Sequence, residues 1–526
     1  MKNISKITIL FLSMFFLSMV SCKKSFLDRP PLDQITFDNF YKTDADLRRA
    51  TGALYGTPWF DFNDKALNAF GDAMSGNLAR TNWTDYSTFA VSSGDSRSNE
   101  AWRSLYKIIA YCNLNIIYIN ENSGTGVTAV AKNNALGELR FLRATAYFYL
   151  VQLFGSVPII TDNRTLADQP LVNRNIVKDV YRFIIEDMTF AARNLRTVKD
   201  AGRVNKWSAE GMLAKIYLTR SGLKDDGTGV NGTRSQSLLD SAKFYAGDVC
   251  KNSALALVPN YDDLFKIANN NNDESLFAFQ WISSTTYGVG NSFQGYFAAE
   301  SKLTGVGDGF GGANTPSINI YEKYTAADTR RKSTFMRNGD VYPELLQSEG
   351  GYKVTELSPH VKKYVVGTPA DNMGKVAFLS TGMNTYILRL ADVYLLYAEA
   401  ILGNNTATSD PDAVNYYNMV RRRAGLTIKA APITKADILL ERRLELAMEG
   451  QYWYDLLRQH DVNPAATIQE IGSQDRGRLT YDASTNTTIK ESVASTPTEA
   501  SFKLQYPAAD VITNPKLLDP AVAYYN

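Results

Sequence analysis

The stretch 438–458, which reads ILLERRLELAMEGQYWYDLLR, decides how the rest of the chain is organised. Thr434 and Asp437 precede it at the spacing of a capping box, and apolar residues then recur at helical intervals. The pattern predicts a buried structural helix. Because glycine costs about 1 kcal/mol inside a helix, Gly450 indicates either close backbone packing or a kink just before Tyr452.

An acidic stripe follows one side of this predicted helix. Glu441, Glu445 and Glu449 recur at intervals of four residues, and like charges at that spacing repel one another. We therefore expect basic side chains from elsewhere in the fold to lie against the stripe. The nearest candidates are Arg421, Arg422 and Arg423. Nothing in the stretch indicates catalysis.

These letters resemble the C-terminal motif of the SusD/RagB family. The matching letters are ERRLEL at 441–446, EG at 449–450, DL at 455–456 and Arg458. Other segments match in order along the chain: FLD at 26–28, LRFLRA at 139–144, FGSVP at 154–158, DTR at 328–330 and YAEA at 397–400. The chain departs from the family pattern at Tyr452, where Arg is usual, and at Gln459, which is often Trp. The resemblance implies a surface lipoprotein of Bacteroidetes-type bacteria that delivers nutrients to an outer-membrane transporter.

The apolar and polar periodicity predicts a mainly α fold of irregularly paired helices. Helical spacing is found near 102–119, 138–154, 177–195, 208–219, 237–252, 391–402 and 412–424. Short strands are expected at 276–281 and 386–390, whereas 57–98 and 463–501 are expected to be loops and turns. The family resemblance adds that tetratricopeptide-like helix pairs form the scaffold.

The chain begins with a predicted export signal. The apolar run 7–20 has about 14 residues, fewer than the roughly 20 that a membrane-spanning helix needs, so 1–21 is interpreted as a signal peptide. Met19-Val20-Ser21-Cys22 resembles a bacterial lipobox, which predicts acylation of Cys22 and a lipid-anchored location on the outer face of the outer membrane. The alternative is ordinary cleavage that leaves a free or disulfide-bonded thiol at this position.

The remaining domain organisation follows from composition. We expect a lipid anchor and extended strap at 22–43, an N-terminal helical region at 44–258 and a C-terminal region at 259–526, packed as one body. The C-terminal region divides into a loop-rich insertion at 259–385, a helical part at 386–460 and a loop and tail at 461–526.

The charge balance argues against a polyanionic partner. The chain has 56 basic and 54 acidic residues, and removing Lys2 and Lys6 with the leader leaves 54 of each. Nucleic-acid binding depends on clustered Lys and Arg, so none is expected. With 3 Cys and 2 His, little material remains for a transition-metal site, and neither a metal nor a cofactor is predicted.

Aromatic residues in polar loops are the candidate ligand site. A Tyr or Trp ring can cover the apolar face of a sugar while neighbouring polar side chains bind its hydroxyl groups. The first predicted cluster comprises Arg80, Asn82, Trp83 and Tyr86, and the second comprises Trp281, Tyr287 and Tyr296. The family resemblance implies ligand contacts in loops from these two regions. The alternative is that most of these rings pack against the scaffold.

Motifs for chemistry are weak. Residues 307–312 fit G-x-G-x-x-G, but the ANTP sequence that follows is a poor helix start, so a turn is predicted. The spacing of His360 and His460 does not match a zinc site. The sequence is compatible with two buried thiols at Cys112 and Cys250 or with a disulfide between them. Paired carboxylates for glycoside hydrolysis leave no linear motif, so a glycan-cleaving enzyme stays a third hypothesis.

With the resemblance, the sequence predicts a non-enzymatic lipoprotein that binds an oligosaccharide and delivers it to a SusC-like TonB-dependent transporter barrel. The alternative ligand for the same role is a peptide or another nutrient.

Overall fold

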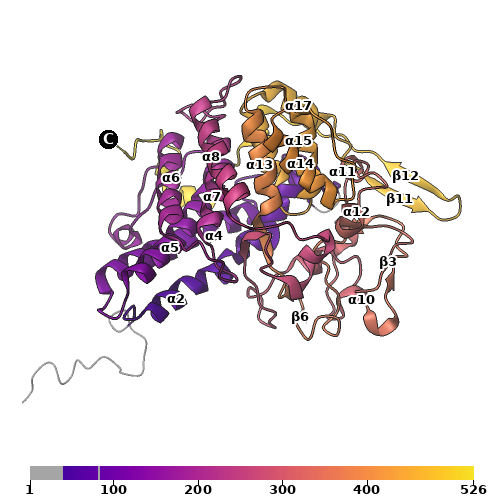
Figure 1. Ribbon diagram of the computed structural model, residues 1–526, viewed down its shortest axis with the longest axis horizontal. Coiled ribbons are helices and arrows are strands. Elements are labelled where there is room, and N and C mark those ends of the chain that lie inside the picture. Colours follow the sequence, from indigo (N-terminus) through magenta and orange to yellow (C-terminus); the bar gives the residue numbers. More distant parts are fainter. Residues whose placement is uncertain (1–39, 81–82, 526) are drawn as a thin grey trace, which may run out of the picture.

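Successive helices pack against one another through the N-terminal half of the computed structural model, which describes residues 40–80 and 83–525 (Figure 1). The short helix α2 (Asp44–Gly52) comes first, with a capping box at Thr43. The main helices are α4 (Ser96–Asn122), α5 (Ala129–Phe154), α6 (Val177–Asn194), α7 (Lys206–Arg220) and α8 (Gln236–Asn252). The predicted signal peptide, Cys22 and most of the strap lie outside the described residues.

Close packing of these helices depends on small residues. Ala144, Ala146, Ala209 and Ala214 are at most 1% exposed, beside buried rings such as Tyr147. A small side chain lets a neighbouring helix approach closely enough for the aromatic ring to fill the remaining space. The mainly α fold expected from the periodicity is confirmed.

Helix α8 joins the two halves of the chain. It packs against α13 (Leu390–Leu402), which packs in turn against α14 (Pro411–Arg423) and α15 (Lys435–Glu445). Between α8 and α13 the insertion forms short helical turns and paired strands, and its one longer ribbon pairs β1 (Ser275–Phe279) antiparallel with β8 (Thr385–Arg389). This ribbon is almost wholly buried.

The other strands of the insertion are two residues long. They pair as β2 (Phe335–Met336) with β5 (His360–Val361), β3 (Val341–Tyr342) with β4 (Tyr352–Lys353), and β6 (Val376–Ala377) with β7 (Ser380–Thr381). A further pair, β9 (Ala407–Thr408) with β10 (Ile433–Thr434), precedes α15. The insertion lies below the C-terminal helices in Figure 1.

The stretch 438–458 is two helices rather than one. Helix α15 keeps its predicted capping box but ends at Glu445, and α16 (Tyr452–His460) follows after a turn in which Met448 and Gly450 have positive φ. The carboxylate of Asp72 accepts hydrogen bonds from the backbone N–H groups of Met448 (3.1 Å) and Gly450 (2.9 Å). A Cβ on Gly71 would lie 2.2 Å from the Cα of Gly450. The close backbone packing expected at Gly450 is confirmed, and the continuous helix is wrong.

Two segments expected to be irregular carry more structure than their sequences indicate. Segment 57–98 contains short turns, η4 (Thr57–Trp59), η5 (Phe62–Ala66) and η6 (Ala69–Ala73), then α3 (Thr84–Ser87) and the start of α4. These turns are mostly buried.

Segment 463–501 was wrongly expected to be loop. It forms α17 (Pro464–Gly472), capped by Asn463, and a hairpin of β11 (Arg478–Asp482) with β12 (Thr487–Glu491). All five residues of β12 are exposed, so no apolar alternation marks it as a strand.

The acidic stripe lies in a buried network of ion pairs. Glu441, Glu445 and Glu449 are at most 2% exposed. Their partners are Arg330, Arg389, Arg421, Arg423 and Lys363. The predictions for Arg421 and Arg423 are confirmed. Arg422 is exposed, so that part of the prediction is wrong.

Arg389 links three of the buried carboxylates. Its guanidinium donates to Glu274, Glu445 and Glu449 and is 1% exposed. Breaking a buried pair leaves an uncompensated charge, so we expect Arg389→Met to lower the free energy of unfolding by about 3–5 kcal/mol. Denaturant titration measures the change. The matched control is Arg478→Met, whose exposed pair with Glu491 should contribute only about 0–1 kcal/mol; equal losses in both variants would contradict this account.

The network also predicts a stability maximum near pH 5. Burial opposes ionisation of Glu445, but the charges of Arg423, Arg389 and Arg330 outweigh it and lower its pKa from 4.5 to about 2. Stability from this group is present above its unfolded pKa of 4.5 and is lost as the pH falls towards 2. Burial raises the pKa of Asp72 from 3.8 to about 6, so stability from this group should instead increase as the pH falls through 6 towards the unfolded pKa of 3.8.

Melting temperatures followed by circular dichroism from pH 8 to about 2 test this profile. Added salt screens exposed ion pairs far more than buried ones. The pH at which the melting temperature begins to fall in acid should therefore stay the same at high ionic strength. A stability that stays flat between pH 4.5 and 2 would count against the network.

Candidate functional site

Exposed rings gather on the insertion, beside the turn η5. We call Tyr287, Tyr296, Phe310 and Phe378 the aromatic surface. Tyr287 is 54% exposed, Phe310 49% and Phe378 51%, while Tyr296 is half-buried. The centroids of the Tyr296 and Phe310 rings lie 6.5 Å apart, and those of Phe310 and Phe378 lie 6.2 Å apart. The surface therefore offers apolar ring area to solvent along a continuous path.

Tyr287 is held by a buried aromatic base. Its ring packs edge-on against Phe60 at 4.9 Å, and Phe60 packs in turn against Trp281 at 6.1 Å. The Tyr287 hydroxyl donates a hydrogen bond to Asp64 Oδ2 at 2.8 Å. A ring fixed at both its edge and its hydroxyl loses little conformational entropy when a ligand lies on it.

Charged groups line the edge of the aromatic surface. Lys65 Nζ lies 3.5 Å from Asp64 Oδ2 and 5.8 Å from the Tyr296 ring centroid. Burial, and then the charge of Asp64, raises the pKa of Tyr287 and of Tyr296. Both phenols are therefore neutral hydrogen-bonding groups at ordinary pH. Burial likewise raises the pKa of the neighbouring Glu100 carboxyl.

Three of the predicted rings do not have an exposed face. Trp83, Tyr86 and Trp281 are 3%, 0% and 5% exposed. The indole N–H groups donate to Asn314 Oδ1 at 2.8 Å and to Thr385 Oγ1 at 3.0 Å, and the Tyr86 hydroxyl donates to Asp95. Buried Trp and Tyr need such polar partners. The expectation that these rings are exposed platforms is wrong, because they pack into the scaffold.

The two predicted clusters nevertheless meet. Asn314 accepts the hydrogen bond from Trp83 and donates through Nδ2 to the Tyr296 carbonyl oxygen at 2.7 Å. Arg80 is exposed, and its backbone N–H donates to the carbonyl oxygen of Arg476. Asn82 lies outside the described residues. Two regions about 200 residues apart in sequence therefore form one neighbourhood.

Sequence reasoning missed Phe310 and Phe378 as site residues. Phe310 lies in the glycine-rich turn, where a Cβ on Gly309 would lie 2.5 Å from the backbone of Glu300. Phe378 lies at the tip of the β6–β7 hairpin, beside Leu379, which has a positive φ of 47°. An aromatic residue in a tight turn has no neighbouring element to pack against and is therefore exposed. This position in a turn is the sequence signal by which Phe310 and Phe378 could have been identified.

The sequence and fold both match a known family. A family model described as the SusD family matches residues 273–524, and one described as starch-binding associating with outer membrane matches 43–218. A SusD-like protein from Bacteroides ovatus is 36% identical over 549 residues, covering 100% of this chain and 99% of its own. The chain belongs to the SusD family.

Solved structures similar to this SusD-family protein include glycan complexes. One, with xylogluco-oligosaccharide, has a TM-score of 0.84 and 36% identity and covers 91% of this chain and 99% of its own. Surface glycan-binding protein A from Bacteroides thetaiotaomicron, in complex with laminarihexaose, has a TM-score of 0.69 at 20% identity, covering 91% and 99%. The second likeness shows the shared fold alone.

Other candidate sites in this SusD-family protein have structural explanations. The glycine-rich segment leads only to the short turn η10 (Gly311–Ala313), as predicted. Cys112 and Cys250 are free thiols, and both histidines are at most 8% exposed. Within 40–80 and 83–525, no group of three or more His, Cys, Asp or Glu residues is placed to hold a metal ion. None of the described helices combines the length and apolar character needed to cross a bilayer.

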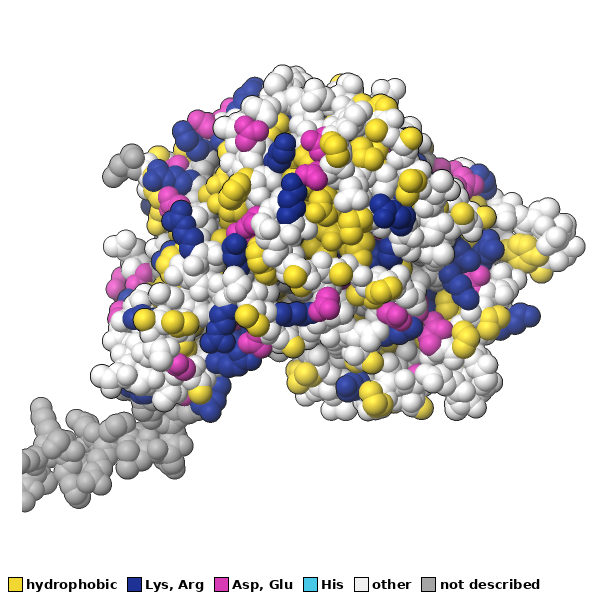
Figure 2. All heavy atoms as spheres, in the orientation of Figure 1, with side chains coloured by type: hydrophobic (Ala, Val, Ile, Leu, Met, Phe, Trp, Pro, Cys, Tyr) yellow, Lys and Arg dark blue, Asp and Glu magenta, His cyan; other side chains and the backbone are white. Residues whose placement is uncertain are grey.

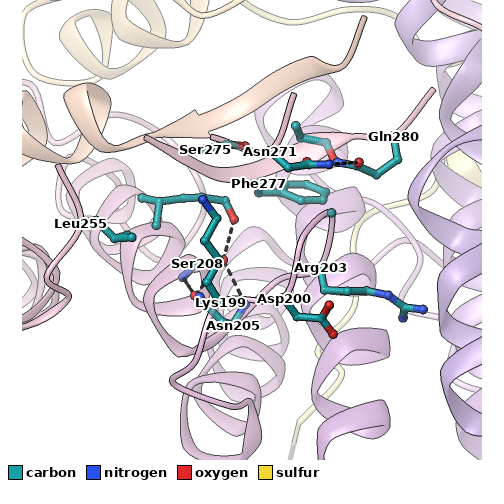
Figure 3. Close-up of a pocket in the computed structure, with 13 residues that line it drawn as sticks. Lys199, Asp200, Arg203, Asn205, Ser208, Leu255, Asn271, Ser275, Phe277 and Gln280 are labelled. Carbon is teal, nitrogen blue, oxygen red and sulfur yellow. Dashed lines mark hydrogen bonds between the residues drawn. The ribbon is translucent and has the colours of Figure 1, made fainter. Parts of the chain in front are cut away.

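A cavity beneath β1 is too small for a nutrient (Figure 3). Its volume is about 20 Å³, enough for one water molecule, and its lining includes Ser208, Phe277 and Gln280. Asn271 donates to the side-chain oxygen of Gln280 across one edge at 3.0 Å. This cavity is a packing feature of the ribbon.

The burial of the indole rings predicts a loss of stability when one of them is removed. Removing a buried Trp side chain from a core typically costs about 3–5 kcal/mol, so Trp281→Ala should lower the free energy of unfolding by that amount. Denaturant titration is the measurement. Phe244→Ala, which truncates a ring that is 66% exposed on α8, is the control and should have little effect. If Trp281→Ala were as stable as that control, the indole could not be part of the packed base.

Proposed function

We propose that this SusD-family protein binds an oligosaccharide on the aromatic surface and delivers it, chemically unchanged, to a SusC-like TonB-dependent transporter. The proposal includes anchoring at the cell surface through an acylated Cys22. The observation that carries it is the group of rings formed by the exposed Tyr287, Phe310 and Phe378 and the half-buried Tyr296, with Tyr287 fixed from below by Phe60 and by the buried Asp64 carboxylate.

The chemistry of the aromatic surface suits sugars. Each ring can cover the apolar face of a pyranose, and by analogy with aromatic pairs contributes about 0.5–1.5 kcal/mol beyond burial. The phenol hydroxyl groups and Lys65 can hydrogen-bond sugar hydroxyls, while the buried Asp64 carboxylate holds the Tyr287 hydroxyl in place. Several rings together reach the millimolar to micromolar range, about −4 to −8 kcal/mol, which suits capture followed by release.

The relatives support a glycan rather than a peptide. A similar protein of known structure, 36% identical over almost the whole chain, was solved with xylogluco-oligosaccharide. The starch-binding protein SusD from Bacteroides thetaiotaomicron is 24% identical over 383 residues, which is 63% of this chain and 65% of its own. Xylogluco-oligosaccharide is therefore the first ligand to test.

Calorimetry with xylogluco-oligosaccharide and with laminarihexaose tests the proposal. We expect saturable binding of one of them, weakened about tenfold by Tyr287→Ala and again by Phe310→Ala, since tenfold corresponds to about 1.4 kcal/mol. Phe244→Ala is the control because it removes an equally exposed ring from α8.

Chromatography of the incubated sugar separates binding from chemistry. Unchanged oligosaccharide is expected, and shorter products would favour a glycan-cleaving enzyme. Wild-type affinity in both Tyr287→Ala and Phe310→Ala would move the site elsewhere, and no affinity for any glycan would favour the peptide alternative.

A further inference from the structure

A cavity of about 510 Å³ lies among three helices of the C-terminal half. We call it the α15–α17 pocket, because α15, α16 and α17 supply most of its lining; α15 and α17 lie close together in Figure 1. Its volume is within the range of small-molecule sites. None of its lining residues belongs to the aromatic surface. Two of them, Tyr452 and Gln459, are where the C-terminal motif departs from the family pattern.

The pocket carries an excess of positive charge. Its lining contains three basic residues, Lys323, Lys435 and Arg443, against one acidic residue, Glu470. Glu470 is itself exposed and accepts a hydrogen bond from the Tyr452 hydroxyl at 3.0 Å. A partly enclosed cavity lined by one sign of charge concentrates ligands of the opposite sign.

Arg443 is a buried charge without a carboxylate partner among the described residues. It is 3% exposed and donates to Asn77 Oδ1, Asn319 Oδ1 and the carbonyl oxygen of Gly76, which are neutral acceptors. Burial, and then the charge of Arg443, lowers the pKa of the buried Arg476 to about 9. Arg443 therefore contributes positive potential behind the pocket, because its own hydrogen-bond partners are neutral.

The two lysines are available to a ligand. Within the described parts of the chain, neither Lys323 nor Lys435 forms an ion pair. Burial lowers the pKa of both ammonium groups, and for Lys323 the charge of Arg443 adds to it. An anion in the pocket would relieve this unfavourable environment.

Gln459 provides a second, independent indication of a ligand. Its side chain is 8% exposed and lines the pocket, yet its Nε2 has no hydrogen-bond partner in the described structure. Buried polar groups are almost always hydrogen-bonded, and the described part of the chain supplies no acceptor for this donor. The Nε2 atom has almost no accessible surface, so the Gln459 side chain must rotate for an anion in the cavity to reach it. The lining also includes the apolar side chains of Leu439, Leu440 and Ala466. Arg443 stacks over the Tyr452 ring at 4.3 Å, which fixes that ring as part of the wall.

We propose that the α15–α17 pocket binds a small organic anion. One carboxylate, sulfate or phosphate group pairs with Lys435 and Lys323, while the amide of Gln459 donates to it. The body of the ligand lies against Leu439 and Leu440. This is a second ligand site, separate from the aromatic surface, and it does not depend on the proposed glycan function.

Matched aryl ligands test the proposal. Para-nitrophenyl β-glucuronide and para-nitrophenyl β-glucoside differ only in the carboxylate, and para-nitrophenyl sulfate and phosphate distinguish the other oxyanions. By calorimetry we expect at least one anionic ligand to bind with one-to-one stoichiometry and about tenfold more tightly than the glucoside. Lys435→Met should remove that preference, and Gln459→Trp should abolish binding by filling the cavity.

Two controls separate this site from other effects. Lys353→Met removes an exposed lysine of β4 and should leave anion binding unchanged. Tyr287→Ala should weaken oligosaccharide binding but not anion binding. Equal affinity for the glucuronide, sulfate, phosphate and glucoside would overturn the proposal. So would wild-type anion binding in both Lys435→Met and Gln459→Trp.

Discussion

The carboxylate of Glu445 is the point on which most of the structure depends. It is fully buried, and arginines reach it from three separate elements: Arg330 at the start of α12 (Arg330–Thr334), Arg389 at the end of β8 and Arg423 at the end of α14. A buried charge is strongly unfavourable unless it is paired. The insertion, the ribbon and the C-terminal helices must therefore come together in one arrangement. Packing of apolar surface alone would specify that arrangement less sharply.

The same ion-pair network fixes the position of the segments that carry the aromatic surface. Arg389 also pairs with Glu274, which immediately precedes β1, so both strands of the ribbon are tied to the network. Trp281 lies two residues after the end of β1, and its indole donates a hydrogen bond to Thr385 of β8. The Tyr287 ring packs against Phe60, which packs in turn against Trp281. A continuous series of contacts thus leads from the buried ion pairs to rings in otherwise irregular loops.

The sequence predicted well whatever depends on local periodicity. The bounds of helix α6 were predicted to within one residue. The prediction of cationic partners for the acidic stripe was also correct, because repulsion between carboxylates at this spacing is a local effect that the sequence shows. Arg330, Arg389 and Lys363 could not be matched to it, since their pairing is set by long-range topology. Exposure was mispredicted for the same reason. Trp83 and Trp281 lie among polar residues in the sequence and so resemble surface rings, but their indole groups are buried and donate to Asn314 and Thr385, which are far away in the sequence. Strand β12 is wholly exposed and β11 buries only Leu479, so neither strand shows an alternation of apolar and polar residues that predicts it. Figure 2 shows both basic and acidic side chains scattered over this face, with one group of basic side chains at the lower left.

The contact between Gly71 and Gly450 bears on how such proteins can diversify. The backbone of the segment that carries Asp64 and Lys65 touches the backbone of the turn between α15 and α16, and Asp72 anchors that turn. Any side chain at either glycine would push the two segments apart. If the aromatic surface is the ligand site, its specificity can change through loop tips such as 310 and 378 without disturbing this contact. A chimera of N-terminal and C-terminal halves from different relatives would fold correctly only when both parent proteins have glycine at positions 71 and 450 and aspartate at position 72.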